Sequence, residues 1–271
     1  MLAKQQICFL GAGNMAEAIM IGLLDQQVPA KQIIASDPLN ARLRQLESSL
    51  QIRTCSSNQL AVVGADLAIL SIKPQVSPAV LAELASCLPP DCLVVSIMAG
   101  ITTETIEAAL PQGTRVIRAM PNTPALVQQA ATAFCTGRHA TAQDVNVAME
   151  LFSALGVVYQ VTEQQMDIVT GLSGSGPAYV FSFIEALADA GVKNGLPRDI
   201  AHGLAVQTVL GAATLVKNSG EHPALLRERV SSPGGTTIAA LHQLENGCFN
   251  GTIMDAVDAA VRRSKELAAR S

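Results

Sequence analysis

A glycine-rich turn near the start of the chain most constrains what this sequence can fold into. Residues 11–16 read GAGNMA, a GxGxxA pattern that directly follows the apolar run 7–10 and opens a long apolar helical stretch. Gly11 permits a tight turn, Gly13 lets the backbone approach a pyrophosphate, and Ala16 allows the helix to pack closely on the strand. Because strand, turn and helix follow in the order that dinucleotide binding needs, the pattern predicts such a site; an ordinary βα turn is the alternative.

The first 160 or so residues alternate short β-type runs with helical patterns, which is typical of a doubly wound α/β domain. Residues 67–72 and 93–97 are continuous apolar runs, as expected of parallel strands covered on both faces. The predicted strands are residues 7–10, 33–36, 67–72, 93–97, 116–119, 132–135 and 157–161. We therefore expect a Rossmann-type dinucleotide-binding domain over residues 1–162.

From residue 163 onward the β signal disappears and helices punctuated by Gly and Pro follow, so we expect an all-α domain over residues 163–271. Residues 200–216 are apolar nearly all round, and such a helix must be surrounded. Polar residues interrupt this stretch, and it is shorter than the ~20 apolar residues that a bilayer crossing needs. We therefore predict no membrane span but burial between subunits, in a homo-oligomer built through the C-terminal helices.

Composition narrows the class of partner. The 271 residues include 18 basic and 22 acidic side chains and only 3% aromatics, so no basic stripe or stacking platform for nucleic acid is expected. Four histidines and six cysteines are dispersed without metal-ligand spacing, and we expect no metal and mostly buried, reduced thiols. The N-terminal residues lack a signal-peptide pattern, which favours a cytoplasmic protein that binds a small molecule.

The end of the second predicted strand gives conflicting signals about the cofactor. It reads Ala35-Ser36-Asp37-Pro38, with Arg42 and Arg44 further on. A carboxylate there would accept hydrogen bonds from a free ribose 2′-hydroxyl, whereas Ser36 and nearby arginines suit a 2′-phosphate. We expect NADPH, with NADH as the alternative, and a solvated helix face as the other explanation of the arginines.

Three further turns follow predicted strands and therefore lie at the carboxyl edge of the sheet, where ligands bind in open α/β folds. They are Ile72-Lys73-Pro74-Gln75, Met98-Ala99-Gly100 and Met120-Pro121-Asn122-Thr123-Pro124. Asn122 could bond a carboxamide or hold its turn through the backbone, and Pro74 and Gly100 could be plain turn residues.

The sequence SSPGGTT, residues 231–237, precedes a helical pattern from Ile238 to about Asn246 that Gly247 closes. Free backbone amides near Gly234 to Thr236, at the positive end of a helix, suit a small carboxylate, and the Thr237 hydroxyl could meet another polar atom of the same ligand. The alternative is a helix start capped by Thr236. No nucleophile paired with a base is recognisable, and hydride transfer needs none.

Four segments together resemble the pyrroline-5-carboxylate reductase family: GAGNMAEA at 11–18, IKP at 72–74, TGLSGSGPAY at 170–179 and VSSPGGTTIAALHQLE at 230–245. The resemblance spans the chain, and its last two motifs are the specific ones. It implies an N-terminal Rossmann domain joined to a helical dimerisation domain that interlocks two subunits, and dimers that can gather into decamers.

The resemblance also implies an activity: reduction of the cyclic imine L-1-pyrroline-5-carboxylate to L-proline with NADPH or NADH, the last step of proline biosynthesis. Thr237 would donate to the ring nitrogen, Glu163 would match an acid near the substrate amine, and the substrate loop could come from the partner subunit. By the same resemblance, Gly11, Ala12, Gly13, Asn14, Met15, Ser36, Asn58, Ile72, Lys73, Pro74, Met98, Ala99 and Gly100 would contact the cofactor, and Ser232, Pro233, Gly234, Gly235, Thr236 and Thr237 the substrate.

Two other functions stay open at this point. Another Rossmann-type NADP-dependent enzyme, such as an imine reductase or a β-hydroxyacid dehydrogenase, would need a different acceptor site, and the latter needs a positioned lysine such as Lys193. Lys193, however, continues a charged stripe with Glu185 and Asp189, which favours a solvated face. A non-catalytic NADPH-binding protein is the third candidate, although it gives the loop at 231–237 no purpose.

Overall fold

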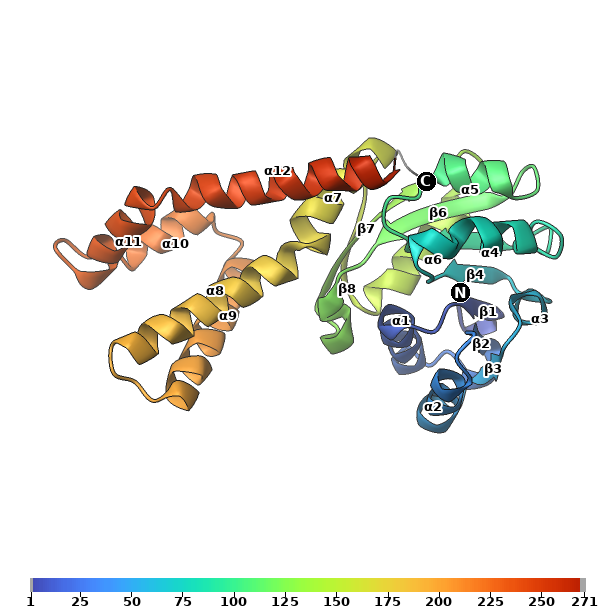
Figure 1. Ribbon diagram of the computed structural model, residues 1–271, viewed down its shortest axis with the longest axis horizontal. Coiled ribbons are helices and arrows are strands. Elements are labelled where there is room, and N and C mark those ends of the chain that lie inside the picture. Colours follow the sequence, from blue (N-terminus) through green and yellow to red (C-terminus); the bar gives the residue numbers. More distant parts are fainter. Residues whose placement is uncertain (1, 269–271) are drawn as a thin grey trace. The chain divides into compact units, whose positions relative to one another are not determined.

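The computed structural model describes residues 2–268, shown in Figure 1. The chain forms two compact units. The first is built from the described parts of Met1–Ser175 and Ala259–Ser271, and the second is Gly176–Asp258. The segment 163–175 and residues 259–268 thus pack with the unit that contains the sheet.

The first unit is organised around one eight-stranded sheet in the order β3-β2-β1-β4-β5-β6-β7-β8. All neighbouring strands are parallel except β6 and β7. The strands are β1 (Ile7–Leu10), β2 (Ile33–Ser36), β3 (Arg53–Cys55), β4 (Leu67–Leu70), β5 (Leu93–Ser96), β6 (Arg115–Met120), β7 (Ala130–Thr136) and β8 (Gly156–Gln160). The seven predicted strands are all present, and the Rossmann-type fold class is confirmed.

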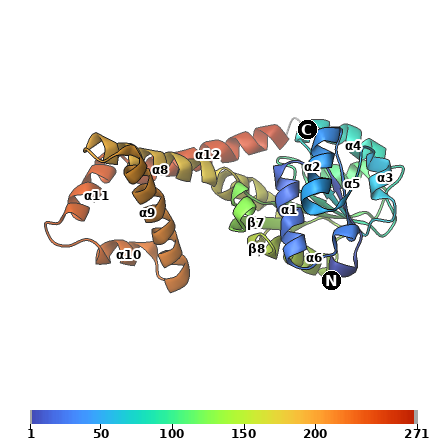
Figure 2. The same cartoon turned by 90° about the horizontal axis from the view of Figure 1, so that it is seen from below.

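Helices cover both faces of this sheet and create two apolar clusters (Figure 2). Side chains alternate along β1, so Ile7 and Phe9 join one cluster while Cys8 and Leu10 join the other. The first cluster takes residues from α1 (Asn14–Asp25), α2 (Asn40–Leu50) and α6 (Ala142–Ser153), and the second from α3 (Asn58–Val62), α4 (Ser77–Leu84) and α5 (Thr103–Ala109). This arrangement leaves the carboxyl ends of the central strands as the edge on which a ligand can bind.

The second unit consists of helices only, as predicted for the C-terminal part of the chain. They are α8 (Gly176–Lys193), α9 (Arg198–Ser219), α10 (Pro223–Arg229), α11 (Thr236–Asn246) and the first half of α12 (Phe249–Ala268). Of its residues, only Ala188, Ala201 and Ala205 are buried. Helix α9 is long and apolar enough to cross a membrane by length and composition, with 11% of the apolar window buried. The chain by itself does not supply the burial expected for residues 200–216.

Short elements connect the sheet to the second unit. They are η5 (Glu163–Gln165), α7 (Met166–Val169) and the π-helical turn η6 (Thr170–Gly174). The glycine-rich sequence Ser173-Gly174-Ser175-Gly176 is therefore the end of this turn and the start of α8, with Pro177 in the first helical turn, where proline is favoured.

Candidate active site

The glycine-rich turn between β1 and α1 is held tightly from behind. Gly11 has a φ of +95°, and a Cβ there would lie 2.5 Å from the Ser71 carbonyl oxygen. The Gly11 N–H donates to the Ser36 carbonyl oxygen at 2.9 Å, and the Ser71 hydroxyl donates to the Gly11 carbonyl oxygen at 2.6 Å. Gly13 is different, because a Cβ there would meet nothing within 4 Å, and no side chain caps α1. The positive end of α1 therefore faces open space.

A groove of about 420 Å³ lies at this edge of the sheet. It brings together predicted cofactor residues from three separate turns, after β1, β4 and β5. Its lining includes Gly13, Asn14, Met15, Ile72, Lys73, Pro74, Met98 and Ala99. The other residues expected to contact the cofactor, Gly11, Ala12, Ser36, Asn58 and Gly100, do not line this groove.

The groove is also lined by residues outside the set expected to contact the cofactor, some of them from the turn 120–124 already predicted to lie at this edge. They are Ala16, Ser71, Ile97, Met120, Pro121, Thr123 and Gly174, together with Asn122. The Asn122 amide nitrogen donates to the Ser173 carbonyl oxygen at 3.0 Å, and its oxygen accepts from the Ala131 N–H at 3.0 Å. The Asn122 side chain thus ties its turn to β7 and to η6, while the residue also lines the groove.

Ser36 and Asn58, both expected near the adenosine end of the cofactor, are in contact. The Ser36 hydroxyl donates to the Asn58 side-chain oxygen at 2.6 Å, and the Asn58 amide donates to a Glu83 carboxylate oxygen at 2.9 Å. Ser36 is 1% exposed, so its hydroxyl lies inside the protein at the tip of β2. The pair joins the β2 tip to the start of α3.

Asp37 and Arg42, which suggested opposite cofactor preferences in the sequence, share a structural task. Asp37 accepts from the Ala12 N–H at 3.0 Å with one oxygen and from the Leu39 N–H at 2.9 Å with the other. The Arg42 Nε donates to the Ala12 carbonyl oxygen at 2.6 Å, and the same guanidinium pairs with Glu17 at 2.7 Å. Both polar groups of Ala12 are thus held from the segment after β2, and the glycine-rich turn is fixed in shape.

The loop before α11 leads to a helix N-terminus that no side chain caps. Helix α11 begins at Thr236 with Gly235 as its N-cap, and no side chain caps it, so the alternative of a Thr236 cap is wrong. Gly234 has a φ of +65°, and the Gly235 N–H donates to the Ser232 carbonyl oxygen at 3.0 Å. A Cβ on Gly235 would lie 2.3 Å from the Ser232 hydroxyl oxygen. Pro233 is exposed and Thr237 half-buried. The loop and the helix end can together accept a small anion.

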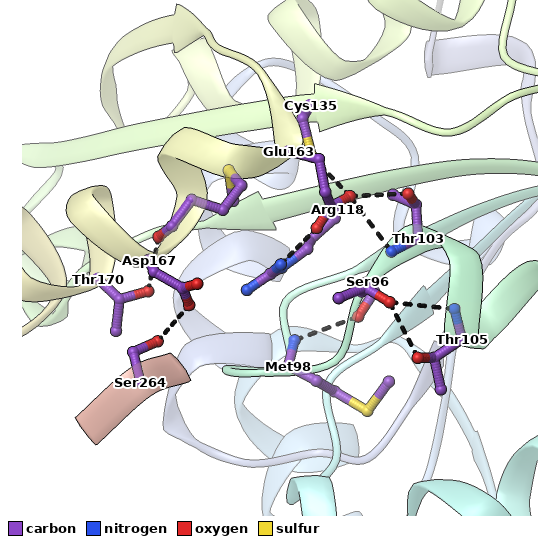
Figure 3. Close-up of polar contacts among 12 residues, drawn as sticks. Ser96, Met98, Thr103, Thr105, Arg118, Cys135, Glu163, Asp167, Thr170 and Ser264 are labelled. Atoms are coloured by element: carbon purple, nitrogen blue, oxygen red, sulfur yellow. Dashed lines mark hydrogen bonds and ion pairs between the residues drawn. The ribbon is translucent and has the colours of Figure 1, made fainter. Parts of the chain in front are cut away.

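Glu163, at the start of η5, is the centre of a polar cluster in the first unit (Figure 3). Arg118 donates to one carboxylate oxygen at 2.5 Å, while Thr103 donates to the other from its hydroxyl at 2.7 Å and its N–H at 3.3 Å. The Cys135 thiol donates to that second oxygen at 3.4 Å. These bonds tie η5 to β6, β7 and the start of α5.

Burial and hydrogen bonding oppose each other in setting the pKa of Glu163. Burial raises the pKa, but the bonds from Thr103 and Arg118 and the Arg118 charge outweigh it, so the pKa lies below its ordinary value. For Cys135, burial and then the Glu163 charge raise the pKa to about 12. Glu163 is therefore an anion paired with Arg118, which is only 3% exposed, and Thr237, the other predicted catalytic residue, lies in the second unit.

Across residues 2–268, no three His, Cys, Asp or Glu side chains gather as a metal site would require. The cysteines form no disulfide, and Cys248 is the exposed one among them. For Cys92, burial raises the pKa to about 12, which keeps that thiol protonated.

Comparison with known proteins identifies both parts of the chain. Residues 163–267 match the family model described as pyrroline-5-carboxylate reductase dimerisation, and residues 6–100 match NADP oxidoreductase coenzyme F420-dependent. The pyrroline-5-carboxylate reductase of Methanosarcina acetivorans is 45% identical over 98% of this chain and 99% of its own length. That of Arabidopsis thaliana is 46% identical over 97% of this chain and 95% of its own.

Solved structures give the same relationship. The chain superposes on a pyrroline-5-carboxylate reductase of Coxiella burnetii with a TM-score of 0.92 and 36% identity, covering 97% of this chain and 98% of that one. A Plasmodium falciparum pyrroline carboxylate reductase with NADP bound gives a TM-score of 0.89 and 30% identity over 99% of this chain and 100% of that one.

Proposed function

This chain belongs to the pyrroline-5-carboxylate reductase family, and from that premise we propose how its residues carry out the reaction. It is an NADP-dependent oxidoreductase of proline biosynthesis that reduces L-1-pyrroline-5-carboxylate to L-proline. The observation that carries this function is the 45% identity over 98% of the chain, which includes both the nucleotide-binding and the dimerisation segments. The roles of single residues below are proposals.

We place the cofactor in the groove at the carboxyl edge of the sheet. The site fits a dinucleotide because a Cβ at Gly13 would meet nothing within 4 Å beside the uncapped N-terminus of α1, which suits a pyrophosphate. Lys73 adds a positive charge, and Met98 and Ala99 line the groove further along. When bound, the reduced nicotinamide supplies the hydride.

Gly11 and Ala12 support this site indirectly, because their hydrogen bonds hold the conformation of the glycine-rich turn between β1 and α1. Ser36 and Asn58 lie toward the adenosine end, with Ser36 favouring NADPH over NADH. Ile72 and Pro74 belong to the same binding edge as Lys73. Gly100 acts through the loop to which it belongs, since it does not line the groove.

The substrate is proposed to bind at the start of α11. Its carboxylate accepts from the backbone amides of Gly234 and Thr236 in the loop from Ser232 to Thr236, where Gly235, whose N–H donates to Ser232, avoids a Cβ that would collide with Ser232. The Thr237 hydroxyl hydrogen-bonds the ring nitrogen and orients the carbon–nitrogen double bond for hydride transfer. Catalysis then comes from positioning and from electrostatic stabilisation of the bound imine.

Glu163, predicted to lie near the substrate amine, already has several hydrogen-bond partners within the protein. Its two carboxylate oxygens already accept from Arg118, Thr103 and Cys135. We propose that Glu163 stays ionised and holds the start of α5 behind the cofactor groove. Contact with the substrate amine is a separate prediction, which the Glu163→Gln variant tests through the pH dependence of kcat.

We further propose a homodimer formed through the C-terminal helices, with assembly into a decamer as the larger form. The match of residues 163–267 to a dimerisation family supports this, as do the exposed Leu204, Leu210 and Leu215 of α9. A second copy of the chain explains the apolar surface of α9 without a membrane. The net charge of −4 supports a protein that does not bind nucleic acid, and we place it in the cytoplasm.

The functional division that we propose is residues 1–162 for the dinucleotide and residues 163–271 for dimerisation and substrate. The dimerisation family match starts at 163, which supports this boundary. The compact units divide differently, at residues 175 and 259, because η5, α7, η6 and the end of α12 pack on the sheet-containing unit.

The activity is tested by adding L-1-pyrroline-5-carboxylate to purified protein and following the loss of reduced-nicotinamide absorbance, with NADPH and NADH run in parallel. Proline formation is checked by chromatography. Turnover with proline as product is expected, faster with NADPH. Folded protein that binds NADPH but forms no proline would contradict the proposal and favour a non-catalytic binding protein.

A further inference from the structure

The last turn of α12 lies against the loop that connects β5 with α5. A Cβ built on Gly100 would lie 3.4 Å from the Ala268 backbone nitrogen and 3.6 Å from the Leu267 Cβ. Gly100 is buried and has a φ of +76°, a conformation that side chains rarely adopt. Its neighbours Met98 and Ala99 line the cofactor groove. The helix end therefore forms the support behind a loop that faces the cofactor.

A buried hydrogen bond links this helix end to α7. Ser264, 4% exposed, donates from its hydroxyl to an Asp167 carboxylate oxygen at 2.6 Å, as Figure 3 shows. Ser264, Leu267 and Ala268 are spaced i, i+3 and i+4, so they lie on one face of α12. The bond to Asp167 in α7 thus holds the same helix face that meets Gly100.

The two ends of the loop are held from elsewhere in the first unit. The Met98 N–H donates to the Ser96 hydroxyl oxygen at 3.3 Å, and Glu163 binds Thr103 at the start of α5. The middle of the loop has α12 behind it at Gly100. A shift of α12 would therefore move Gly100 and its neighbours Met98 and Ala99, which line the groove, before it moves the two ends of the loop.

We propose that Ser264 and Asp167 are positioning residues for cofactor binding. Their hydrogen bond docks the end of α12 against Gly100 and so keeps Met98 and Ala99 in the arrangement that lines the groove. Neither residue lines the groove itself. The inference rests on the proposed function, because it assumes that this groove holds NADPH.

Cofactor binding and docking of the α12 end are expected to stabilise each other. If the docked helix end favours NADPH binding, then bound NADPH favours the docked helix end by the same free energy. Amide hydrogens of the last turn of α12 are then expected to exchange more slowly in the presence of NADPH. Both partners of the bond belong to the segment that matches the dimerisation family, and they would affect the cofactor without lining its groove themselves.

The main test compares variants of the full-length protein for NADPH affinity, measured by titration, and for steady-state kinetics. Ser264→Ala is expected to raise the Kd and KM for NADPH by about 3- to 10-fold, because only part of the free energy of the lost hydrogen bond affects cofactor binding. The kcat at saturating NADPH is expected to stay unchanged. Ser264→Thr keeps the hydroxyl and is expected to restore affinity. Asp167→Ala is expected to match Ser264→Ala.

Arg263→Ala is the matched control, since Arg263 precedes Ser264 on α12 but pairs with Glu266 on the surface, where both side chains are more than half exposed. Its NADPH affinity is expected to equal that of the unmodified protein. Equal NADPH affinity in Ser264→Ala and Arg263→Ala would overturn the proposal, as would a loss of kcat without a change in Kd.

Two further outcomes are distinguished. Failure of the unmodified protein to bind NADPH would count against the proposed function and, with it, against this inference. If Ser264→Ala does not fold, hydrogen exchange on the unmodified protein decides: slower exchange of the residue 264–268 amides with NADPH supports the proposal, and unchanged exchange overturns it.

Discussion

The two compact units differ in how they exclude water. In the first, every residue of β1, β4 and β5 is buried, and apolar clusters fill both faces of the sheet. In the second, the buried residues are three alanines, while Leu204, Leu210 and Leu215 of α9 are exposed. Since apolar burial is the main favourable term in folding, the first unit has a core of its own. The second needs a second copy of the chain to complete one.

The largest expected effect follows from breaking that second core. Leu204 and Leu215 lie on one face of α9 and are 56% and 55% exposed in the single chain. Replacing both with Glu should abolish dimerisation and lower kcat by more than about 100-fold, because charges cannot be buried between subunits without large cost. Sedimentation and turnover measure the two effects. Lys217→Glu, a charge change at an exposed position of the same helix, should retain the dimer; a dimeric, active double variant would refute this account.

The next effect concerns the ion pair that joins η5 to β6 within the first unit. Glu163→Ala leaves Arg118, 3% exposed, without its ion-pair partner, and should destabilise the protein by about 3 to 5 kcal/mol in urea unfolding. Glu266→Ala, which breaks the exposed pair with Arg263, should change stability by less than about 1 kcal/mol. Similar losses in the two variants would show that the Glu163 cluster is not a structural centre.

The same pair predicts a pH dependence. Because folding lowers the pKa of Glu163, the ionised carboxylate stabilises the folded state above its unfolded pKa, near the ordinary value of 4.5, and this stabilisation is lost as pH falls through the folded pKa. The stability difference between the unmodified protein and Glu163→Gln should therefore shrink below about pH 4.5 and stay constant above it. A difference independent of pH would exclude a lowered pKa. A Glu163→Gln change in the kcat profile near neutrality would instead place Glu163 at the substrate.

A smaller effect is expected at the proposed substrate loop of the second unit. Thr237→Ala should lower kcat/KM by about 10- to 100-fold through loss of one hydrogen bond worth roughly 1.5 to 3 kcal/mol. Thr237→Ser, which keeps the hydroxyl, should retain most of the activity. Unchanged kinetics in Thr237→Ala would remove this residue from the site.

The smallest effects separate two neighbours at the tip of β2. Asp37→Ala should weaken NADPH and NADH alike, by several-fold, since Asp37 holds the Ala12 N–H of the shared glycine-rich turn. Ser36→Ala should weaken NADPH more than NADH. The ratio of kcat/KM for the two cofactors is the measurement, and an Asp37→Ala variant with a shifted ratio would mean that the carboxylate selects the cofactor.

Local pattern predicted most of the first unit and the helical nature of the second. Continuous apolar runs mark strands buried on both faces, whereas β3 is a three-residue edge strand of sequence RTC, too short and polar for that signal. Contacts between residues far apart in the sequence have no comparable local pattern from which they could be predicted. Arg118 meets Glu163 across 45 positions, Asp37 holds Ala12 across 25, and Gly100 meets Ala268 through the packing of the whole unit.

The most direct test of whether two chains complete each active site together is a heterodimer of two different low-activity variants, purified through two different tags. One carries Gly13→Asp, which puts a carboxylate at the open end of α1, where a Cβ meets nothing within 4 Å; the other carries Thr237→Ala. If the substrate loop of one chain serves the cofactor groove of the other, one of the two sites in each heterodimer has both parts intact. We predict about half of the unmodified dimer's turnover, against the low activity of either damaged homodimer. Turnover no higher than that of the homodimers would contradict a site shared between the two subunits.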